Sequence, residues 1–330
     1  MTNRIKVLYF AFTDETMHRL VRHRMPDWVE LVTLQEGTDA ERLEKIADAD
    51  AVLLAGRKLD ERFLDAARQL KLVVFHGVGY HDYVDSESLR RRGIALTISP
   101  AGTGLGVAEH TIMLMLAVGK RLPFIDGKLR QGVWLAQNLR AESRQIFGKT
   151  VGIIGFGRIG REVARRLAGW GTTIIYHDIA AVPEEVEREL SATRHPLDAL
   201  LATSDIVTLH VPLTTATRNL IDRRALALMK PGAMLINCAR GPVVDEDALV
   251  EALRAGRLGG AGLDVFAVEP PPSPTPFAAF HNTVLTPHNA PGTADIMLMK
   301  MEEIWSELSL FFAGEAMRNE IVGGGAIGSR

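Results

Sequence analysis

Residues 150–178, TVGIIGFGRIGREVARRLAGWGTTIIYHD, decide the expected fold of this chain. An apolar run at Val151–Ile154 leads into a glycine-rich turn, and a segment with helical periodicity and a second β-rich run follow. Gly155 allows the tight turn, Gly157 lets the backbone come close to a pyrophosphate, and Gly160 lets the helix pack against the strand. Asp178 ends the second strand, where its carboxylate can accept hydrogen bonds from ribose hydroxyls. The order predicts a βαβ unit that binds a dinucleotide.

The same stretch indicates which dinucleotide is bound. We expect a helix over 160–168. At its start, with Arg158 and Ile159 just before it, free backbone N–H groups and the positive end of the helix dipole favour phosphate. Residues 179–181 after Asp178 are Ile-Ala-Ala, so no arginine follows directly to hold a 2′-phosphate. We therefore expect NAD as the cofactor, in preference to NADP.

The length, composition and charge of the chain limit which kinds of protein are expected. With 330 residues the chain can form two domains with full cores, and its 47% hydrophobic and 24% charged content is ordinary for a globular protein. The net charge of −2 gives no electrostatic reason to expect a nucleic-acid or membrane partner. A single cysteine, Cys238, fits a reducing compartment, and the N-terminus reads directly into a strand, so we expect a cytoplasmic protein without a metal site.

Short strand-like runs alternate with helical patterns along the whole chain, which predicts an α/β fold with parallel sheets. The expected strands are 5–11, 29–34, 51–55, 72–75, 94–98, 151–154, 173–176, 206–210, 234–237, 261–265 and 283–285, and the expected helices before the last one are 16–23, 40–49, 61–68, 107–118, 123–132, 160–168, 197–202, 224–229 and 245–255. We expect two doubly wound domains. Residues 1–101 with 293–330 would form a discontinuous, flavodoxin-like substrate domain, and residues 102–292 a Rossmann NAD-binding domain. The return to the first domain would be made by a long helix at about Ala294–Phe312.

Three charged residues follow predicted strands of the second domain, at the edge where open parallel sheets bind ligands. Arg240 comes after the run Leu235–Asn237, and Glu269 and His288 follow the next two strands. A guanidinium can hold a carboxylate through two hydrogen bonds. A histidine with a carboxylate partner can pass a proton near neutral pH. Together they suit hydride transfer to or from a carbon that carries an oxygen.

The chain resembles the D-isomer-specific 2-hydroxyacid dehydrogenases from about Asp50 to Asn319. The matching motifs occur in the family's order and are GFGRIG with Asp178, HVPLT at 210–214, NCARGPVVDEDAL at 237–249, GLDVF at 262–266 with Glu269-Pro270, and TPH at 286–288. The resemblance implies an NAD-dependent enzyme that acts on a small D-2-hydroxy acid or the corresponding 2-keto acid.

The resemblance also implies roles for individual residues. Arg240 would bind the substrate carboxylate, His288 would be the acid/base and Glu269 its partner. Backbone N–H groups at Val78 and Gly79 would meet the same carboxylate. The remaining implied residues belong to the cofactor site, with Asp264 near the nicotinamide carboxamide and the cleft lined by His210, Val211, Pro212, Cys238 and Ala239.

Three departures from the family's pattern lie around the expected substrate pocket. The segment Tyr80–Tyr83 is one residue longer than usual, and Asn289 takes the place of an aliphatic residue after the histidine. Phosphoglycerate-type members place Arg-Ser where this chain has Ala55-Gly56, which disfavours a phosphorylated substrate unless Arg57 or Lys58 compensates.

Two alternatives stay open at the level of the sequence. The C-terminal-binding corepressors resemble this family and use NAD(H) for dimerisation, not for turnover. Phosphite oxidation is a different reaction that also uses the Arg/Glu/His set. Hydrolysis of a homocysteine adduct is disfavoured because its own motifs are absent. We also expect a homodimer through the cofactor domain, built on the apolar segments Val107–Val118 and Pro123–Asn138.

Overall fold

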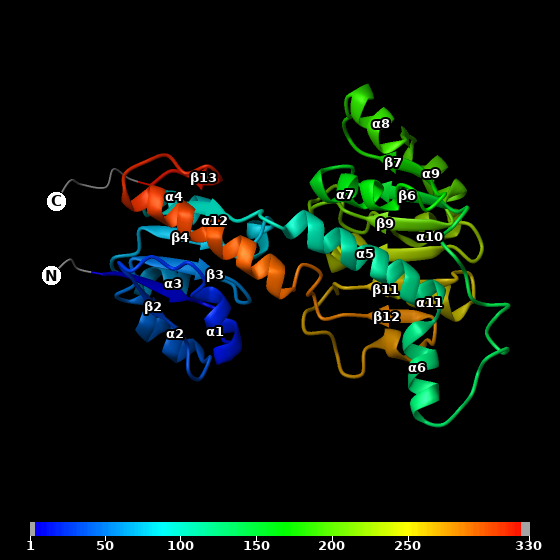
Figure 1. The fold of residues 1–330 in the computed structure, drawn as a ribbon, viewed down its shortest axis with the longest axis horizontal. Helices are drawn as coiled ribbons and strands as arrows, with labels where there is room; N and C mark the ends of the chain where they lie inside the picture. Colours follow the sequence, from blue (N-terminus) through cyan, green and yellow to red (C-terminus); the bar gives the residue numbers. More distant parts are fainter. Residues whose placement is uncertain (1–3, 325–330) are drawn as a thin grey trace. The chain divides into compact units, whose positions relative to one another are not determined.

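The structure is a computed structural model that describes residues 4–324. The described chain divides into two compact units, one formed by residues 4–103 with 292–324 and the other by residues 104–291. Each unit has its own sheet, and its helices lie on both faces of that sheet (Figure 1). The assignment of these units to substrate and cofactor remains a prediction at this point.

Unit 1, the first of these, contains a six-stranded sheet in the order β13-β5-β4-β3-β1-β2 within the described residues. The pairs are parallel except that β13 runs antiparallel to β5. The order 2-1-3-4-5 of its parallel strands is that of flavodoxin-like folds. Its elements are β1 Ile5–Tyr9, α1 Glu15–Val21, β2 Val29–Val32, α2 Asp39–Ile46, β3 Ala51–Leu54, α3 Glu61–Ala66, β4 Leu72–Phe75, a 3₁₀ turn at Tyr80–Asp82, α4 Ser86–Arg91, β5 Ala95–Ile98, α12 Ala294–Phe312 and β13 Glu320–Val322.

Unit 2 contains a seven-stranded, fully parallel sheet in the order β12-β11-β10-β9-β6-β7-β8 within the described residues. Counted from β6, this is the 3-2-1-4-5-6 order of dinucleotide-binding folds with one further strand. Its elements are α5 Thr103–Gly119, α6 Leu122–Arg130, β6 Thr150–Ile154, α7 Arg158–Leu167, β7 Thr173–His177, α8 Glu184–Leu190, β8 Ala192–Arg194, α9 Leu197–Thr203, β9 Ile206–Leu209, α10 Arg223–Leu228, β10 Met234–Asn237, α11 Glu246–Arg254, β11 Gly260–Leu263 and β12 Thr283–Leu285, with 3₁₀ turns at Gly241–Val243 and Pro276–Ala279.

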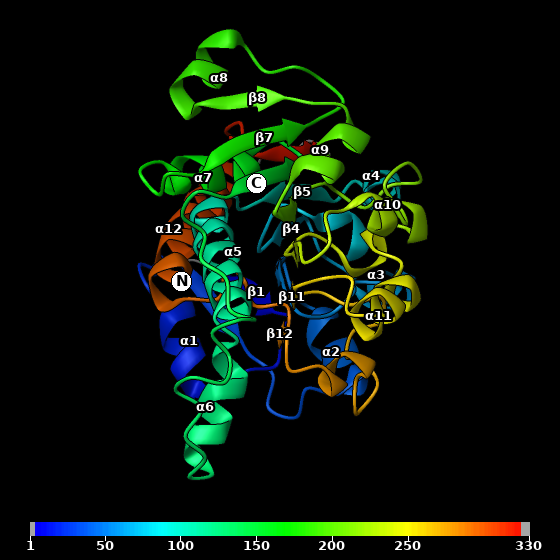
Figure 2. The ribbon, with the colours of Figure 1, turned by 90° about the vertical axis from the view of Figure 1, so that its right-hand side faces the viewer.

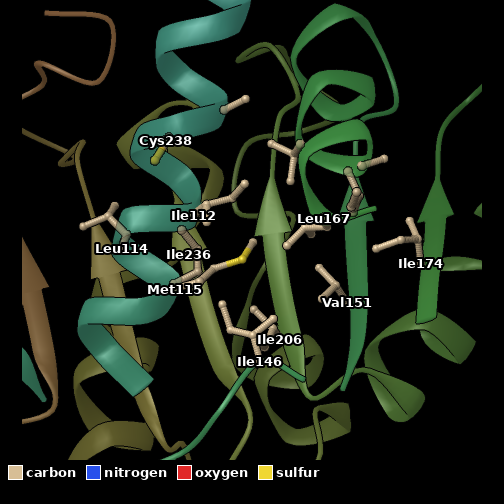
Figure 3. Packing of buried hydrophobic residues seen from close by; sticks show 14 of the residues in the cluster. Ile112, Leu114, Met115, Ile146, Val151, Leu167, Ile174, Ile206, Ile236 and Cys238 are labelled. Carbon is tan, nitrogen blue, oxygen red and sulfur yellow. The ribbon is translucent and has the colours of Figure 1, made fainter. Parts of the chain in front are cut away.

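Apolar side chains along the strands of unit 2 point alternately to the two faces of the sheet, so a hydrophobic core lies on each face. Val151 and Ile153 of β6 pack with α5 and α7, whereas Ile154 packs with α9, α10 and α11 on the other face. Successive strand side chains point to opposite faces, so an uninterrupted apolar run is what a doubly covered strand needs. Figure 3 shows the first of these cores, with Ile112 and Met115 of α5 lying over the sheet. In Figure 2, α5 and α11 lie on opposite sides of β11 and β12.

Both sheets confirm the predicted α/β fold class, and most predicted elements are present. Helix α12 has the predicted bounds, and α5 extends four residues further at its start. Four elements had no counterpart in the sequence analysis, namely α4, α8, β8 and β13. They are short, and the two strands have only three residues each, too few to show a periodicity.

Candidate active site

The glycine-rich turn of unit 2 has the geometry that a dinucleotide needs. Gly155 has φ of +91°, and a Cβ there would lie 2.6 Å from the backbone of His210 on the neighbouring strand end. A Cβ on Gly160 would lie 2.2 Å from the carbonyl oxygen of Gly155, so α7 packs directly on the turn. At Gly157 a Cβ would meet nothing within 4 Å. The outer two glycines are therefore needed by the fold, while the middle one leaves space beside the backbone for another molecule.

The start of α7 offers unpaired hydrogen-bond donors beside that space. Gly157 is the N-cap and has no side chain to cap the helix. The first N–H that bonds back is that of Arg161, to the carbonyl oxygen of Gly157 (3.1 Å). The N–H groups of Arg158, Ile159 and Gly160 thus remain available to an anion. This cradle fits a pyrophosphate group.

Asp178 ties the end of β7 to the glycine turn. Its Oδ2 accepts from the N–H of Phe156 (2.7 Å) and its Oδ1 from that of Ala180 (3.3 Å). Arg194 of β8 lies beside it, because its Nη2 donates to the carbonyl oxygen of Asp178 (2.9 Å). No arginine directly follows Asp178 in the sequence, but the pairing of β8 with β7 brings Arg194 to this place from sixteen residues away.

The predicted cofactor cleft follows β9 and β10. Burial lowers the pKa of His210 to about 3, and its Nε2 pairs with Thr208 Oγ1 (3.0 Å). Its Nδ1 is buried without a hydrogen-bond partner among the described residues. Cys238 and Ala239 are buried, and burial raises the pKa of the Cys238 thiol to about 12. The thiol is therefore protonated near neutral pH and is a packing group, not a nucleophile. Val211 and Pro212 follow His210 on the same strand end and are partly or fully exposed.

The segments that carry Arg240 and Glu269 come together through a close backbone approach. A Cβ at Gly241 would lie 1.9 Å from the carbonyl carbon of Phe266, so only glycine fits there. Arg240 is partly buried, and its Nη1 donates to the carbonyl oxygen of Ala239 (2.7 Å). The amide of Asn237 donates to the carbonyl oxygen of Arg240 (3.0 Å), which fixes the turn after β10.

Glu269 and His288 form an ion pair beyond the ends of β11 and β12. Glu269 Oε2 lies 2.6 Å from His288 Nδ1, and Glu269 Oε1 accepts from the N–H of Phe266 (3.0 Å). Burial alone would raise the pKa of Glu269. The hydrogen bonds from His288 and Phe266 and the positive charge of Arg240 outweigh that effect, and the pKa of Glu269 is lowered. Glu269 is therefore a carboxylate whose Oε2 faces Nδ1 of the His288 ring.

A buried aspartate holds the turn on which His288 stands. Asp264 is fully buried, and its carboxylate accepts from Thr286 Oγ1 (2.6 Å), Asn289 N and Ala290 N (both 3.0 Å). His110 of α5 joins this cluster through a contact between its Nε2 and Thr286 Oγ1 (2.9 Å). Burial would raise the pKa of Asp264, but the bonds from His110, Thr286 and Asn289 keep it lowered. The sequence analysis placed Asp264 in the site but gave His110 no part in it.

The predicted substrate loop lies in unit 1, after β4. Val78 is 42% exposed, and the rings of Tyr80 and His81 stack with their centroids 3.9 Å apart. Within the described part of the chain, the backbone N–H groups of Gly77 and Val78 have no hydrogen-bond acceptor. Adjacent unpaired N–H groups of this kind are typical of anion sites.

Within residues 4–324, no group of three or more His, Cys, Asp or Glu side chains could hold a metal ion. None of the helices described has both the length and the apolar content needed to cross a membrane.

The family model for the D-isomer specific 2-hydroxyacid dehydrogenase, NAD binding domain, matches residues 112–290. Across 279 residues the chain is 41% identical to a glyoxylate reductase of Thermococcus onnurineus, an alignment that covers 83% of each chain. It is 36% identical to a D-3-phosphoglycerate dehydrogenase of Methanocaldococcus jannaschii over 86% of this chain, and spans only 54% of that relative.

A solved structure is similar to nearly the whole length of the chain. The TT0316 protein from Thermus thermophilus aligns with a TM-score of 0.83 at 34% identity, and the match covers 96% of this chain and 99% of that one. The likeness therefore includes both units, whereas the family model matches within unit 2 only.

Proposed function

Because this chain belongs to the D-isomer-specific 2-hydroxyacid dehydrogenase family, we propose that it interconverts a small D-2-hydroxy acid and its 2-keto acid. The chain is an oxidoreductase of that family with an NAD-binding domain. The observation that carries the proposal is the 2.6 Å contact between Glu269 and His288, beyond the strand ends of the same sheet that bears the dinucleotide turn.

We assign the role of general acid and base to His288. Its Nδ1 faces Glu269, which leaves Nε2 to donate to the carbonyl oxygen of a 2-keto acid or to accept from the hydroxyl of a 2-hydroxy acid. The carboxylate of Glu269 orients the ring and stabilises the imidazolium before the proton is given up. Bound NAD supplies the hydride chemistry, and the protein supplies the proton and the orientation.

Arg240 would bind the substrate carboxylate, with the backbone N–H groups of Val78 and Gly79 as further donors. A guanidinium binds a carboxylate in a fixed planar geometry, so it also sets the orientation of the neighbouring reacting carbon. Asp178 would accept from the ribose hydroxyls, the first turn of α7 would hold the pyrophosphate, and Asp264 would lie near the nicotinamide carboxamide. The strand-end residues 210–212 and 238–239 would line the rest of the cofactor site.

The test is loss of NADH absorbance against a panel of 2-keto acids. We expect glyoxylate and hydroxypyruvate to be reduced. Phosphohydroxypyruvate should be a poor substrate, because the uncharged Ala55-Gly56 stands directly after β3 and the guanidinium of the next residue, Arg57, already donates to Asp39 Oδ2 (2.7 Å). Pyruvate, phenylpyruvate and 2-ketoisocaproate report how much side chain the pocket accepts, and phosphite is tested with NAD. If no compound of the panel is turned over while NADH still binds tightly, the protein is an NAD(H) sensor and not a dehydrogenase.

We further propose that the protein is a homodimer through unit 2. Helix α6 projects away from the seven-stranded sheet in both ribbon views (Figures 1 and 2). The arm formed by residues 122–149 borders a hollow of about 900 Å³, lined in part by Leu122, Leu129 and Trp134. These three side chains are 52%, 56% and 76% exposed, which is unusual for apolar groups gathered around one hollow. A second copy of the chain would cover them.

A further inference from the structure

Helix α12 places a lysine inside unit 1. Lys300 is only 5% exposed and lies on the inward face of the helix with the apolar side chains of Met297, Met301 and Ile304. Its Nζ donates to the backbone carbonyl oxygen of His76, 2.7 Å away. Placing an ammonium out of water is unfavourable unless other groups stabilise it. Among the described residues, that peptide carbonyl is the only hydrogen-bond acceptor of the Lys300 ammonium.

The carbonyl of His76 belongs to the peptide that opens the predicted substrate loop. In a trans peptide the N–H of Gly77 points away from the carbonyl of His76. The N–H groups of Gly77 and Val78 are the two in this loop that have no acceptor within residues 4–324. A cation bonded to a carbonyl polarises its peptide, so the N–H on the other side becomes a better donor.

Within the described part of the chain, Lys300 makes no direct ion pair. Glu303 lies one turn further along α12, but its Oε2 accepts from Ser99 Oγ (2.7 Å) and from the N–H of Ala101 (2.9 Å). Burial lowers the pKa of Lys300 to about 8, and the charge of Glu303 opposes that shift. Burial and the charge of Lys300 lower the pKa of His76 to about 3, and burial raises the pKa of Tyr9 to about 12. Both rings are therefore uncharged near neutral pH.

We infer that Lys300 is a positioning residue for the substrate carboxylate, acting through the His76–Gly77 peptide. The ammonium fixes the carbonyl of His76 and thereby aims and strengthens the N–H groups of Gly77 and Val78. The inference rests on the proposed function in one respect, namely that this loop meets a carboxylate. It adds a second cation, besides Arg240, to the recognition of that group.

The test compares Lys300→Met with wild type in the full-length protein. Methionine keeps most of the side-chain volume and removes a buried charge, so the fold is expected to persist. We expect KM for glyoxylate and Kd for oxalate, measured by calorimetry with NADH bound, to rise about tenfold. The kcat and the Kd of NADH are expected to change less than twofold, on the order of measurement scatter. Lys300→Gln keeps a hydrogen-bond donor without the charge, so its KM and Kd should lie between those of wild type and Lys300→Met.

Lys45→Met is the matched control. Lys45 also lies in unit 1 and its Nζ also donates to a backbone carbonyl, that of Thr33 (2.7 Å), but Thr33 belongs to no predicted site. This variant should leave KM for glyoxylate and Kd for oxalate unchanged. Because Lys300 loses its proton as the pH rises through about 8, oxalate affinity in the wild type should fall over that range. The Lys300→Met protein should lack that fall.

The outcomes separate this inference from the proposed function. If glyoxylate is reduced and Lys300→Met keeps wild-type KM and the same pH dependence, the inference is wrong and the function stands. If no 2-keto acid is reduced but oxalate binding depends on Lys300, the function is wrong and the inference stands. If no 2-keto acid is reduced and oxalate does not bind wild-type protein loaded with NADH, both are wrong.

Discussion

His288 has a backbone φ of 51°, a left-handed conformation that side chains with a Cβ seldom adopt. Its own N–H donates to the carbonyl oxygen of Asp264 (2.7 Å), and the carboxylate of Asp264 accepts from the two N–H groups that follow. The strained turn is thus held by a residue outside it. Such local strain is commonly found where a side chain must be aimed for function.

Replacement of His288 by alanine should remove the acid/base without disturbing the turn, since the bonds that hold the turn are made by its backbone. We expect kcat to fall by about 10²- to 10⁴-fold, which is the usual contribution of general acid–base catalysis. The Kd of NADH, measured by fluorescence, should stay near the wild-type value. Turnover close to that of the wild type would show that the proton comes from another group.

Replacement of Arg240 by alanine should weaken binding of the keto acid and lower kcat together, because the carboxylate loses both affinity and orientation. From the strength of hydrogen bonds between charged groups, kcat/KM should fall by about tenfold to a hundredfold. Arg240→Lys keeps the charge but not the planar pair of donors, so it should recover only part of the loss. Equal activity of the lysine variant and wild type would contradict the two-bond geometry.

The sequence predicted Arg240, Glu269 and His288 because each follows a strand and stands in a recognisable motif. Lys300, His110 and Arg194 could not be found in this way. Lys300 lies within a helix whose apolar pattern predicts burial but not the carbonyl that its ammonium meets. His110 and Arg194 are defined by contacts with segments far along the chain, and only the packed structure brings these together.

At the scale of elements, the turn between β6 and α7 and the ends of β7 and β8 form one structure around the expected ribose position. Asp178 connects β7 to the turn through Phe156, and Arg194 reaches the same place from β8. A carboxylate there repels a 2′-phosphate, while an arginine attracts one. We therefore expect Asp178, which lies between the glycine turn and Arg194, to decide whether NAD or NADP is preferred.

Asp178→Ala should shift the preference from NADH towards NADPH. The variant loses the acceptor for the ribose hydroxyls and keeps Arg194, whose guanidinium can then hold a phosphate. We expect the ratio of kcat/KM for NADH over NADPH to fall by about tenfold to a hundredfold. The double variant Asp178→Ala/Arg194→Ala is the control and should bind NADPH less well than the single variant. An unchanged ratio in the single variant would argue against the ribose contact.

Long elements with clear patterns were predicted well, and short ones were missed. Helix α7 was expected over 160–168 and occupies Arg158–Leu167, because its buried positions Val163, Ala164 and Leu167 recur at helical spacing. Strand β8 has three residues, of which only Ala192 is buried. It exists because it pairs with β7, an interaction that no local pattern reveals.

At the scale of the whole molecule, the two sheet orders follow from rules that act along the entire chain. Parallel strands need crossover helices, and right-handed crossovers limit how those strands can be ordered. Alternating strands and helices therefore predicted two doubly wound sheets. The antiparallel strand β13 could not be inferred from these rules, since the chain reaches it from α12 without a crossover.

We expect the arm at residues 122–149 to form the contact of a homodimer. In a monomer, the exposed side chains of Leu129 and Trp134 would leave a large apolar hollow open to water, and closing it with a second copy is favourable in proportion to the area removed. Light scattering at micromolar concentration should therefore give the mass of a dimer. A paired substitution, Leu129→Glu with Trp134→Glu, should give a monomer, because two carboxylates in the contact would have to lose their hydration.

Phe12→Glu is the matched control for that substitution. Phe12 is 55% exposed and lies in unit 1, so the variant also removes an exposed apolar ring, yet it should remain dimeric. If wild type is monomeric at these concentrations, the hollow beside α6 belongs to some other partner and the homodimer is wrong. If both variants remain dimeric, the dimer is formed through a different surface, and the exposed arm needs another explanation.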